Sequence, residues 1–325
     1  MIKIRIATFN LDNLGSRPGN GPPIEARIAL LRPQLLRLDA DVLCLQEVNA
    51  EKTSRRTERA LPALNALLAE TPYSAYTRVT SKGSGGQGPA DIHNIVILSR
   101  LRVIAHEQLW HDLVPPLSYR VAAKSAEVET RFDRPILHAT VALPDGRCLH
   151  VINLHLKAPL AAAIPGQKES PFVWKSTGAW AEGFYVAACK RSGQALEARL
   201  LLDRLFDTEA SALVAVCGDF NAESHETPVR ILLAQEDDTG SRTLAPRQLT
   251  ILESELPKNR RFTIRHGGRK LVFDHILASS ALAAYHRKTE IHNSALADEV
   301  FDAASVMSVP SFHAPVVSEL VLTEV

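Results

Sequence analysis

Residues 212–221 of this chain read ALVAVCGDFN, an apolar run that ends in two polar side chains, Asp219 and Asn221. Six consecutive apolar residues closed by a glycine predict a strand that is buried on both faces. Side chains two positions apart on an extended segment point to the same side, so Asp219 and Asn221 are expected to act on the same group. An Asx-type turn after a buried strand is the structural alternative.

Five further segments place polar side chains at the end of an apolar run. They are Thr8-Phe9-Asn10, Gln46-Glu47, Asn153-Leu154-His155, Phe273-Asp274-His275 and Ser311-Phe312-His313. Each has a structural explanation when taken alone, since asparagine is a common turn residue and a single strand histidine is more often structural than catalytic. Together they supply oxygen ligands for a hard cation such as Mg²⁺ and side chains that can transfer protons. These groups are required to hydrolyse a phosphate ester.

In this order, the six motifs resemble those of the endonuclease/exonuclease/phosphatase superfamily, whose members are metal-dependent phosphoesterases. The resemblance extends from Asn10 to Pro315, which is nearly the whole chain. It implies a hydrolase acting on ester bonds, of the nuclease, phosphodiesterase or phosphatase type, in which a metal assists the attack of water. It also implies a divalent cofactor, Mg²⁺ or Mn²⁺, with Asn10 and Glu47 at the metal.

The same resemblance implies catalytic roles for five residues. Asp219 would orient or deprotonate the attacking water, and Asn221 would hydrogen-bond the phosphate or a metal-bound water. His155 would contact the phosphate or act as a general acid. Asp274 would hold His313 through a carboxylate–imidazole bond, which fixes the tautomer of the ring and raises its basicity.

One motif departs from the family pattern. The family usually has Ser-Asp-His at the last motif, with the aspartate near the metal, whereas this chain has Phe312 in the middle position. The departure predicts weaker metal binding unless Asp302 or His275 compensates. The alternative to an active enzyme is a binding or scaffold protein that retains the fold and has lost activity, with Phe312 as the lesion.

Bulk composition limits the partners of the protein. Of its 325 residues 46% are hydrophobic, and 37 Lys and Arg nearly balance 36 Asp and Glu. A protein that depends on non-specific nucleic-acid affinity usually carries a basic excess. The phosphate-ester substrate therefore stays open among nucleic acid, nucleotide, inositol phosphate and phospholipid. A basic cluster over residues 258–270 is either a rim that attracts a polyanion or a solvated hairpin face.

The sequence also carries information on compartment. The four cysteines form no CxxC motif and are expected to be free thiols in a reducing compartment: Cys44, Cys148, Cys189 and Cys217. Met1 leads directly into an alternating strand, so no signal peptide is expected. No apolar stretch approaches the ~20 residues of a membrane span. These features predict a cytoplasmic protein without a transmembrane segment, and they leave the oligomeric state open.

Apolar periodicity predicts the main helices. One covers residues 25–38 and is expected to kink or divide at Pro33, and another runs from a Ser192 cap to Phe206. Residues 159–185 show no clear periodicity and predict a long loop rich in aromatic side chains.

Strands and hairpins occur in both halves of the chain, with Asp145-Gly146 as a strong hairpin signal. Because the motifs come from both ends of the chain, we expect one domain spanning residues 1–325. Its expected class is α+β, a four-layer α/β/β/α sandwich of two mostly antiparallel sheets, which the family resemblance makes DNase I-like.

Overall fold

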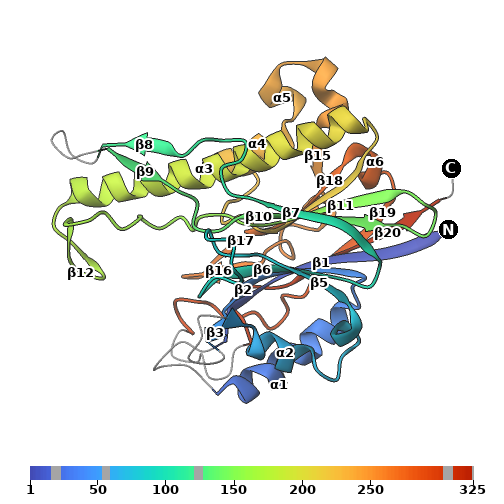
Figure 1. Ribbon diagram of the computed structural model, residues 1–325, viewed down its shortest axis with the longest axis horizontal. Helices are drawn as coiled ribbons and strands as arrows, with labels where there is room; N and C mark the ends of the chain where they lie inside the picture. Colours follow the sequence, from blue (N-terminus) through green and yellow to red (C-terminus); the bar gives the residue numbers. More distant parts are fainter. Residues whose placement is uncertain (16–22, 53–58, 121–126, 303–309, 324–325) are drawn as a thin grey trace.

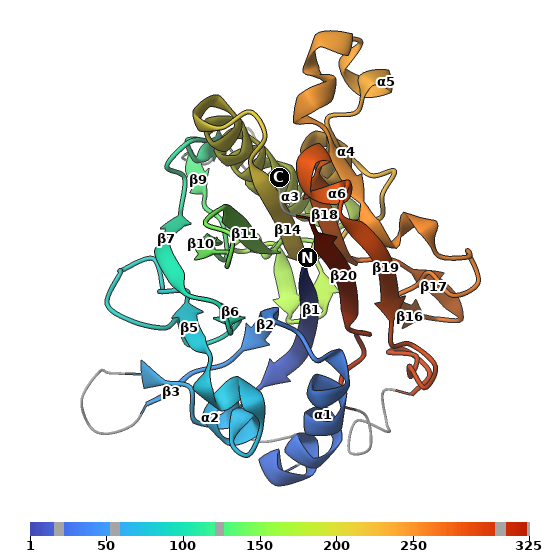
Figure 2. The same cartoon turned by 90° about the vertical axis from the view of Figure 1, so that its right-hand side faces the viewer.

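In the computed structural model of the protein, two six-stranded sheets pack face to face, and helices cover the outer face of each (Figure 1, Figure 2). The predicted α+β class and its α/β/β/α layering are confirmed. The structure describes residues 1–15, 23–52, 59–120, 127–302 and 310–323.

The first sheet contains the N-terminal strand at its centre. Its strands are, in spatial order, β19 (His286–Ile291), β20 (Val316–Leu322), β1 (Ile2–Leu14), β2 (Val42–Val48), β6 (Asn94–Ser99) and β5 (Thr77–Thr80). β1 and β2 are parallel, and the other neighbours are antiparallel. Asn10 pairs in register with Gln46, so two of the predicted motifs lie side by side at one edge.

The second sheet has the same arrangement, with one parallel pair at its centre. Its strands are, in spatial order, β15 (Leu249–Ile251), β18 (Asp274–Ser279), β14 (Leu213–Asp219), β11 (Cys148–His155), β10 (Ile136–Ala142) and β7 (Val103–Leu109). β11 and β14 are parallel, and His155 pairs with Asp219. Asp219 in turn pairs with Asp274 of antiparallel β18. Three motifs therefore meet at one edge of this sheet.

The period-two alternation of the strands divides the apolar residues among layers. Ala215 and Cys217 face the core between the sheets, whereas Val214 and Val216 face the helices on the outside. Two helices cover each outer face: α1 (Ile24–Leu38) and α2 (Pro62–Leu68) on the first sheet, and α3 (Thr177–Thr208) and α4 (Thr227–Leu233) on the second.

The remaining described elements are short. The two-stranded hairpins are β3 (Glu51–Lys52) with β4 (Arg59–Ala60), β8 (Leu117–Tyr119) with β9 (Val128–Thr130), β12 (Lys168–Ser170) with β13 (Val173–Trp174), and β16 (Ile264–His266) with β17 (Arg269–Leu271). The short helices are α5 (Glu236–Thr239), α6 (Ser280–Ala283), η1 (Pro72–Ala75), η2 (Arg242–Arg247) and η3 (Leu252–Glu255). None of the helices in the described part of the chain combines the length and apolarity needed to cross a bilayer.

Two sequence-based predictions about helices are wrong: the division of the first helix at Pro33 and the start of the second near Ser192. α1 is one helix that contains Pro33, because its buried side chains on both sides of the proline pack on the first sheet and hold the helix together. α3 begins at Thr177 rather than near Ser192, and Ser176 is its cap, accepting a hydrogen bond from the backbone N–H of Ala179. The first half of α3 was predicted as loop because exposed aromatic side chains and glycines obscure its apolar stripe.

Candidate active site

The seven predicted site residues lie together at the edge of the sandwich where the central strands end. Asn10 and Glu47 come from the first sheet, and the other five come from the second sheet and the C-terminal segment: His155, Asp219, Asn221, Asp274 and His313. Asn10, His155, Asp219 and Asp274 are at most 2% exposed. The parallel pairs at the centre of each sheet explain this convergence, because parallel strands end at the same edge.

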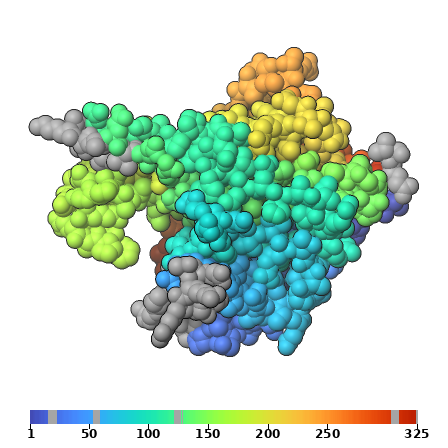
Figure 3. All heavy atoms as spheres, in the orientation of Figure 1, coloured from blue at the N-terminus to red at the C-terminus, as the bar shows by residue number. Residues whose placement is uncertain are grey.

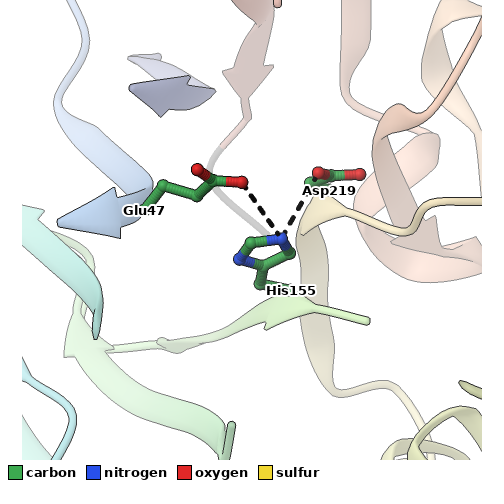
Figure 4. Close-up of side chains that lie close together, drawn as sticks. All are labelled: Glu47, His155 and Asp219. Atoms are coloured by element: carbon green, nitrogen blue, oxygen red, sulfur yellow. Dashed lines mark ion pairs between the residues drawn. The ribbon is translucent and has the colours of Figure 1, made fainter. Parts of the chain in front are cut away.

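Two carboxylates approach one ring nitrogen of His155 (Figure 4). The Nε2 atom of His155 lies 3.6 Å from Oε1 of Glu47 and 3.5 Å from Oδ2 of Asp219. The amide of Asn10 joins the same two carboxylates, because its Nδ2 donates to Glu47 at 3.2 Å and to Asp219 at 2.9 Å. Side chains from both sheets therefore meet around one small volume.

Burial changes the acidity of Asp219. Removal from water raises the pKa of Asp219 to about 7, although the positive charge of His313 acts to lower it. The carboxylate accepts the backbone N–H of Asn221 at 2.8 Å and the side-chain amide of Asn221 at 3.2 Å. The same amide donates to the carbonyl oxygen of Leu156 at 3.0 Å, so both of its hydrogens are engaged within the protein.

His155 and His313 have opposite charge preferences. Burial, followed by the positive charge of Arg134, holds the pKa of His155 well below its usual range and keeps the ring neutral. Burial would also lower the pKa of His313, but the carboxylates of Asp274 and Asp219 outweigh it and raise this pKa to about 10. Nδ1 of His313 lies 2.9 Å from Oδ2 of Asp274, which is the predicted carboxylate–imidazole bond.

The residues present fit a divalent cation. Ligand atoms of Glu47, His155 and Asp219 all lie within 4.8 Å of one another. The carboxylate oxygens of Glu47 and Asp219 are the ligands here that suit a hard cation such as Mg²⁺ or Mn²⁺. The imidazole of His155 suits a softer metal better, and Asn10 presents its NH₂ group to the carboxylates in this structure. A second group, formed by Asp219, Asp274 and His313, is also compact, but its histidine is already bonded to Asp274.

Three residues at the site were missed by sequence reasoning: Asn13, His93 and Arg134. Arg134 is 8% exposed and donates to Nδ1 of His93 at 3.2 Å, so the other ring nitrogen, Nε2, must carry the proton and donate to Oδ1 of Asn13 at 2.8 Å. The backbone N–H of Asn13 then donates to Glu47 at 3.0 Å. These hydrogen bonds, which run from Arg134 through His93 and Asn13, fix the orientation of the Glu47 carboxylate. In the sequence, the polar pair Asp12-Asn13 directly follows the first motif and is the signal that could have indicated Asn13.

Backbone strain is concentrated at the site. In the described chain nine non-glycine residues have a left-handed φ, and five of them belong to the site or adjoin it: Asp12, Asn13, Glu47, His93 and Asn221. Such conformations are unfavourable for residues with a side chain and persist where surrounding contacts impose them. The φ of +58° at Glu47 aims its carboxylate across the gap between the sheets instead of along the strand.

Two motif residues have a structural role. Gln46 donates to Oδ1 of Asn153 at 2.7 Å and exchanges hydrogen bonds with Thr8. Asn153 donates to the carbonyl oxygens of Leu45 and Val96 at 3.1 and 3.0 Å. Because Asn153 lies in the second sheet and its acceptors in the first, this fully buried network ties the sheets together beneath the site.

Phe312 is partly buried, between two residues that are held in place. The hydroxyl of Ser311 donates to the carbonyl oxygen of Asn10 at 2.8 Å and accepts the N–H of His313 at 3.0 Å. Both residues considered as compensation for the missing aspartate already have partners. His275 bonds to Glu253 and to the carbonyl of Ala222 on the outer face of the sheet. A carboxylate oxygen of Asp302 accepts the backbone N–H of Asp298.

A model of the Endonuclease/Exonuclease/phosphatase family matches residues 7–305. The chain therefore belongs to this family, and the resemblance noted in its motifs is confirmed. Members of the family are mostly hydrolases that act on phosphoester bonds, and their fold suggests dependence on a divalent metal. No curated protein sequence matches this chain.

Solved structures share the fold over nearly the full length. Truncated TDP2 of Caenorhabditis elegans is 15% identical, with a TM-score of 0.57 over 98% of this chain and 97% of that one. A functionally unknown conserved protein from Enterococcus faecalis V583 is 17% identical, with a TM-score of 0.56 over 98% and 99%. An endonuclease/exonuclease/phosphatase family protein from Bacteroides thetaiotaomicron is 14% identical, with a TM-score of 0.58 over 99% and 99%. At these identities the similarity establishes the fold alone.

Proposed function

We propose that this protein is a divalent-metal-dependent phosphoesterase that hydrolyses a phosphodiester or phosphomonoester, as a nuclease or phosphatase. The observation that carries the proposal is the convergence of Glu47 and Asp219 on the neutral ring of His155, with Asn10 donating to both carboxylates. His313 supplies one positive charge close to Asp219, and a divalent cation beside Glu47 would further offset the repulsion between the two carboxylates.

We assign the cofactor, Mg²⁺ or Mn²⁺, to Glu47 and Asn10. When bound, the metal would neutralise charge on the phosphoryl oxygens. The protein contributes to this site by orientation: Asn13 and Asn10 each donate to Glu47, and the His93–Arg134 chain holds Asn13. In this structure the amide of Asn10 donates to both carboxylates, and its carbonyl oxygen accepts the N–H of Asp12 at 2.9 Å. To ligate the metal, the Asn10 amide would have to turn so that this oxygen faces Glu47.

Asp219 is the group we propose to orient or deprotonate the attacking water. Burial raises its pKa to about 7 without metal, and a cation bound beside Glu47 would lower this pKa, so the carboxylate is available as a base at neutral pH. Asn221 holds the Asp219 carboxylate with both its backbone and its side chain. A direct contact from the Asn221 side chain to phosphate would require its amide to leave either Leu156 or Asp219.

His313, held by Asp274, is proposed as the cationic partner of the phosphoryl group. A ring with a raised pKa remains protonated at neutral pH and stabilises negative charge that develops on phosphate oxygens. His155 is neutral and lies between the two carboxylates, so we propose it as a phosphate contact or a proton donor to the leaving oxygen. Both roles use residues that the sequence motifs indicate.

We also propose that residues 1–325 form one domain. β1 from the N-terminus pairs with β20 from the C-terminus over seven residues, from Ile2 with Leu322 to Thr8 with Val316. His313 and Asn10 stand at opposite ends of the chain and are linked through Ser311. Division of the chain between these residues would dismantle the site.

A second candidate, a scaffold that retains the fold without turnover, is favoured by one observation only, Phe312 in place of the family aspartate.

The experiment that distinguishes the two functions is an assay of a substrate panel with and without Mg²⁺ or Mn²⁺. The panel contains phosphomonoesters, bis-p-nitrophenyl phosphate, DNA, RNA, nucleotides and phospholipids. Metal affinity is measured in parallel by calorimetry. We expect metal-dependent hydrolysis of at least one class.

The decisive variant is Glu47→Gln, which keeps the size of the side chain and removes its charge. We expect loss of metal binding and of hydrolysis with an unchanged melting temperature in chelator. Glu209→Gln, at an exposed position after α3, is the matched control and should leave both unchanged. Metal affinity that survives in Glu47→Gln would remove Glu47 from the metal site. Metal binding without hydrolysis of any substrate in the panel would favour the scaffold.

A further inference from the structure

A structured arm projects from the sandwich beside the candidate active site. We define the aromatic arm as residues 157–191, which begin two residues after His155. It contains the β12–β13 hairpin and the first half of α3, which extends beyond the second sheet (Figure 1). Figure 3 shows this part of the chain, in yellow-green on the left, as a lobe that stands away from the body.

Specific packing holds the arm in shape. Ala162 in the preceding loop and Trp174 of the hairpin lie very close to α3 at Gly183. A Cβ atom at Gly183 would be 2.5 Å from the carbonyl oxygen of Ala162 and 2.8 Å from the ring of Trp174. A small core of its own, separate from the three main ones, forms beneath: Ala162, Ile164, Val186 and Ala187. The exposed side chains of the arm are therefore presented by a folded support.

The surface of the arm is rich in exposed apolar side chains. Phe172, at the turn of the hairpin, is 93% exposed, the largest value for any large apolar side chain among the described residues. Four further members are 41–52% exposed: Val173, Trp180, Phe184 and Tyr185. Single exposed apolar side chains are common on proteins, but a group of this size on one projection indicates a surface that binds a partner.

Two basic side chains, Lys168 and Lys175, flank the exposed hairpin. The arm contains three further basic residues, but Lys157 and Lys190 are paired with Asp133 and Arg191 is buried. Lys168 and Lys175 are therefore the basic groups that the arm offers to an anionic partner.

Some ring faces of the arm are already occupied by neighbouring side chains. Lys168 lies over the ring of Trp174, at 4.5 Å from its centroid. Trp180 and Phe184 stack on each other with centroids 5.3 Å apart. Base stacking in single-stranded nucleic acid uses open ring faces along a basic groove. An amphipathic surface with Phe and Trp at its apolar tip and Lys at its border is typical of proteins that lie at the lipid–water interface.

We propose that the aromatic arm binds the surface of an anionic lipid bilayer, with Phe172 inserted among the lipids and Lys175 at the headgroups. The partner is a lipid surface of negative charge. This contact goes beyond hydrolysis itself and does not depend on the residues that hold the metal. Because the arm starts directly after His155, binding would bring the catalytic edge of the sandwich close to the membrane.

Co-sedimentation with vesicles tests the proposal, using the full-length protein and mixed phosphatidylserine–phosphatidylcholine vesicles. We expect binding that weakens with salt, and a blue shift of tryptophan emission because two of the three tryptophans, Trp174 and Trp180, lie in the arm. Phe172→Ser should lower the partition coefficient roughly tenfold or more. Lys175→Gln should lower it about fivefold on these vesicles and leave binding to pure phosphatidylcholine unchanged.

Leu36→Ser is the control, because Leu36 is 45% exposed on α1 at a distance from the arm, and it should bind vesicles like the parent protein. Hydrolysis of soluble bis-p-nitrophenyl phosphate should be equal in all variants, which separates this proposal from the proposed function. Equal sedimentation of the Phe172→Ser and parent proteins would overturn the proposal. Binding of a single-stranded oligonucleotide that depends on Phe172, without vesicle binding, would overturn it in favour of nucleic acid.

Discussion

Nδ1 of His313 lies 2.9 Å from Oδ2 of Asp274, although 38 residues separate them in the chain. Asp274 is fully buried at the start of β18, and its backbone N–H bonds to the hydroxyl of Thr263. The buried negative charge raises the pKa of His313 to about 10, against the effect of burial, together with the charge of Asp219. The pair is thus arranged to keep a cationic imidazole at the site.

Asp274→Asn should therefore lower turnover by about a hundredfold or more at alkaline pH. The asparagine keeps the shape of the side chain but not its charge, so the pKa of His313 falls. Below the lowered pKa the ring is still protonated, and the loss should be smaller at pH 6 than at pH 9. Turnover is measured across this range with saturating metal, and melting curves verify folding. A loss of equal size at every pH would contradict the proposed role of the Asp274 charge.

Asp219→Asn should reduce turnover by about a thousandfold while KM changes little, since a group that acts on water contributes mainly in the transition state. The variant retains an acceptor for the N–H of Asn221 and should fold normally. Steady-state kinetics on the best substrate of the panel provide the measurement. A change confined to KM would make Asp219 a binding residue and leave the base unidentified.

Phe312→Asp should tighten Mg²⁺ binding, because a carboxylate beside His313 adds an oxygen ligand and negative charge near the cation. Phe312 is only partly buried, so the desolvation cost of the new charge is limited. Calorimetric affinity and the rise in melting temperature on adding Mg²⁺ are the readouts. Phe172→Asp adds the same charge on the aromatic arm and should not change metal affinity. A variant that melts earlier at every Mg²⁺ concentration would show that packing of Phe312 outweighs the metal.

The stability of the fold should fall in mild acid because of a histidine cluster away from the site. Nε2 of His138 lies 3.0 Å from Nδ1 of His150, and Nδ1 of His138 lies 3.1 Å from Glu107. Burial, then the charge of His138, lowers the pKa of His150 to about 4. Between pH 6.5 and 4 the unfolded chain binds a proton that the folded chain does not, so the free energy of unfolding decreases as the pH falls through this range.

Denaturant unfolding at a series of pH values measures this effect. Between pH 6.5 and 4, the free energy of unfolding of His150→Gln should decrease by about 1–2 kcal/mol less than that of the parent protein. This figure allows for solvent screening of a half-buried group. The chain has 12 histidines, so the quantity to compare is the difference between the parent and the variant. Parallel curves for the two proteins would exclude a contribution from His150.

The candidate site could be predicted largely from sequence, because its residues follow apolar runs that can only be buried strands. Asp219, Asn10 and His155 each stand at the end of such a run, and their register in parallel pairs places them at one edge. Asn13 and Arg134 could not be predicted, since their roles depend on a chain of hydrogen bonds through His93 that joins distant segments. Sequence patterns report local periodicity and carry no information on such contacts.

The sequence by itself determined the fold class, the family and the groups that meet at the site, because hydrophobic period and short polar motifs are local properties. Only the tertiary structure decided that α1 continues through Pro33 and that α3 begins at Thr177. α1 packs on the first sheet and the first half of α3 on the small core of the arm, and such packing outweighs local helix signals. It also decided the charges of the site. The pKa of Asp219 and that of His313 depend on burial and on neighbours that the chain brings together only when it folds.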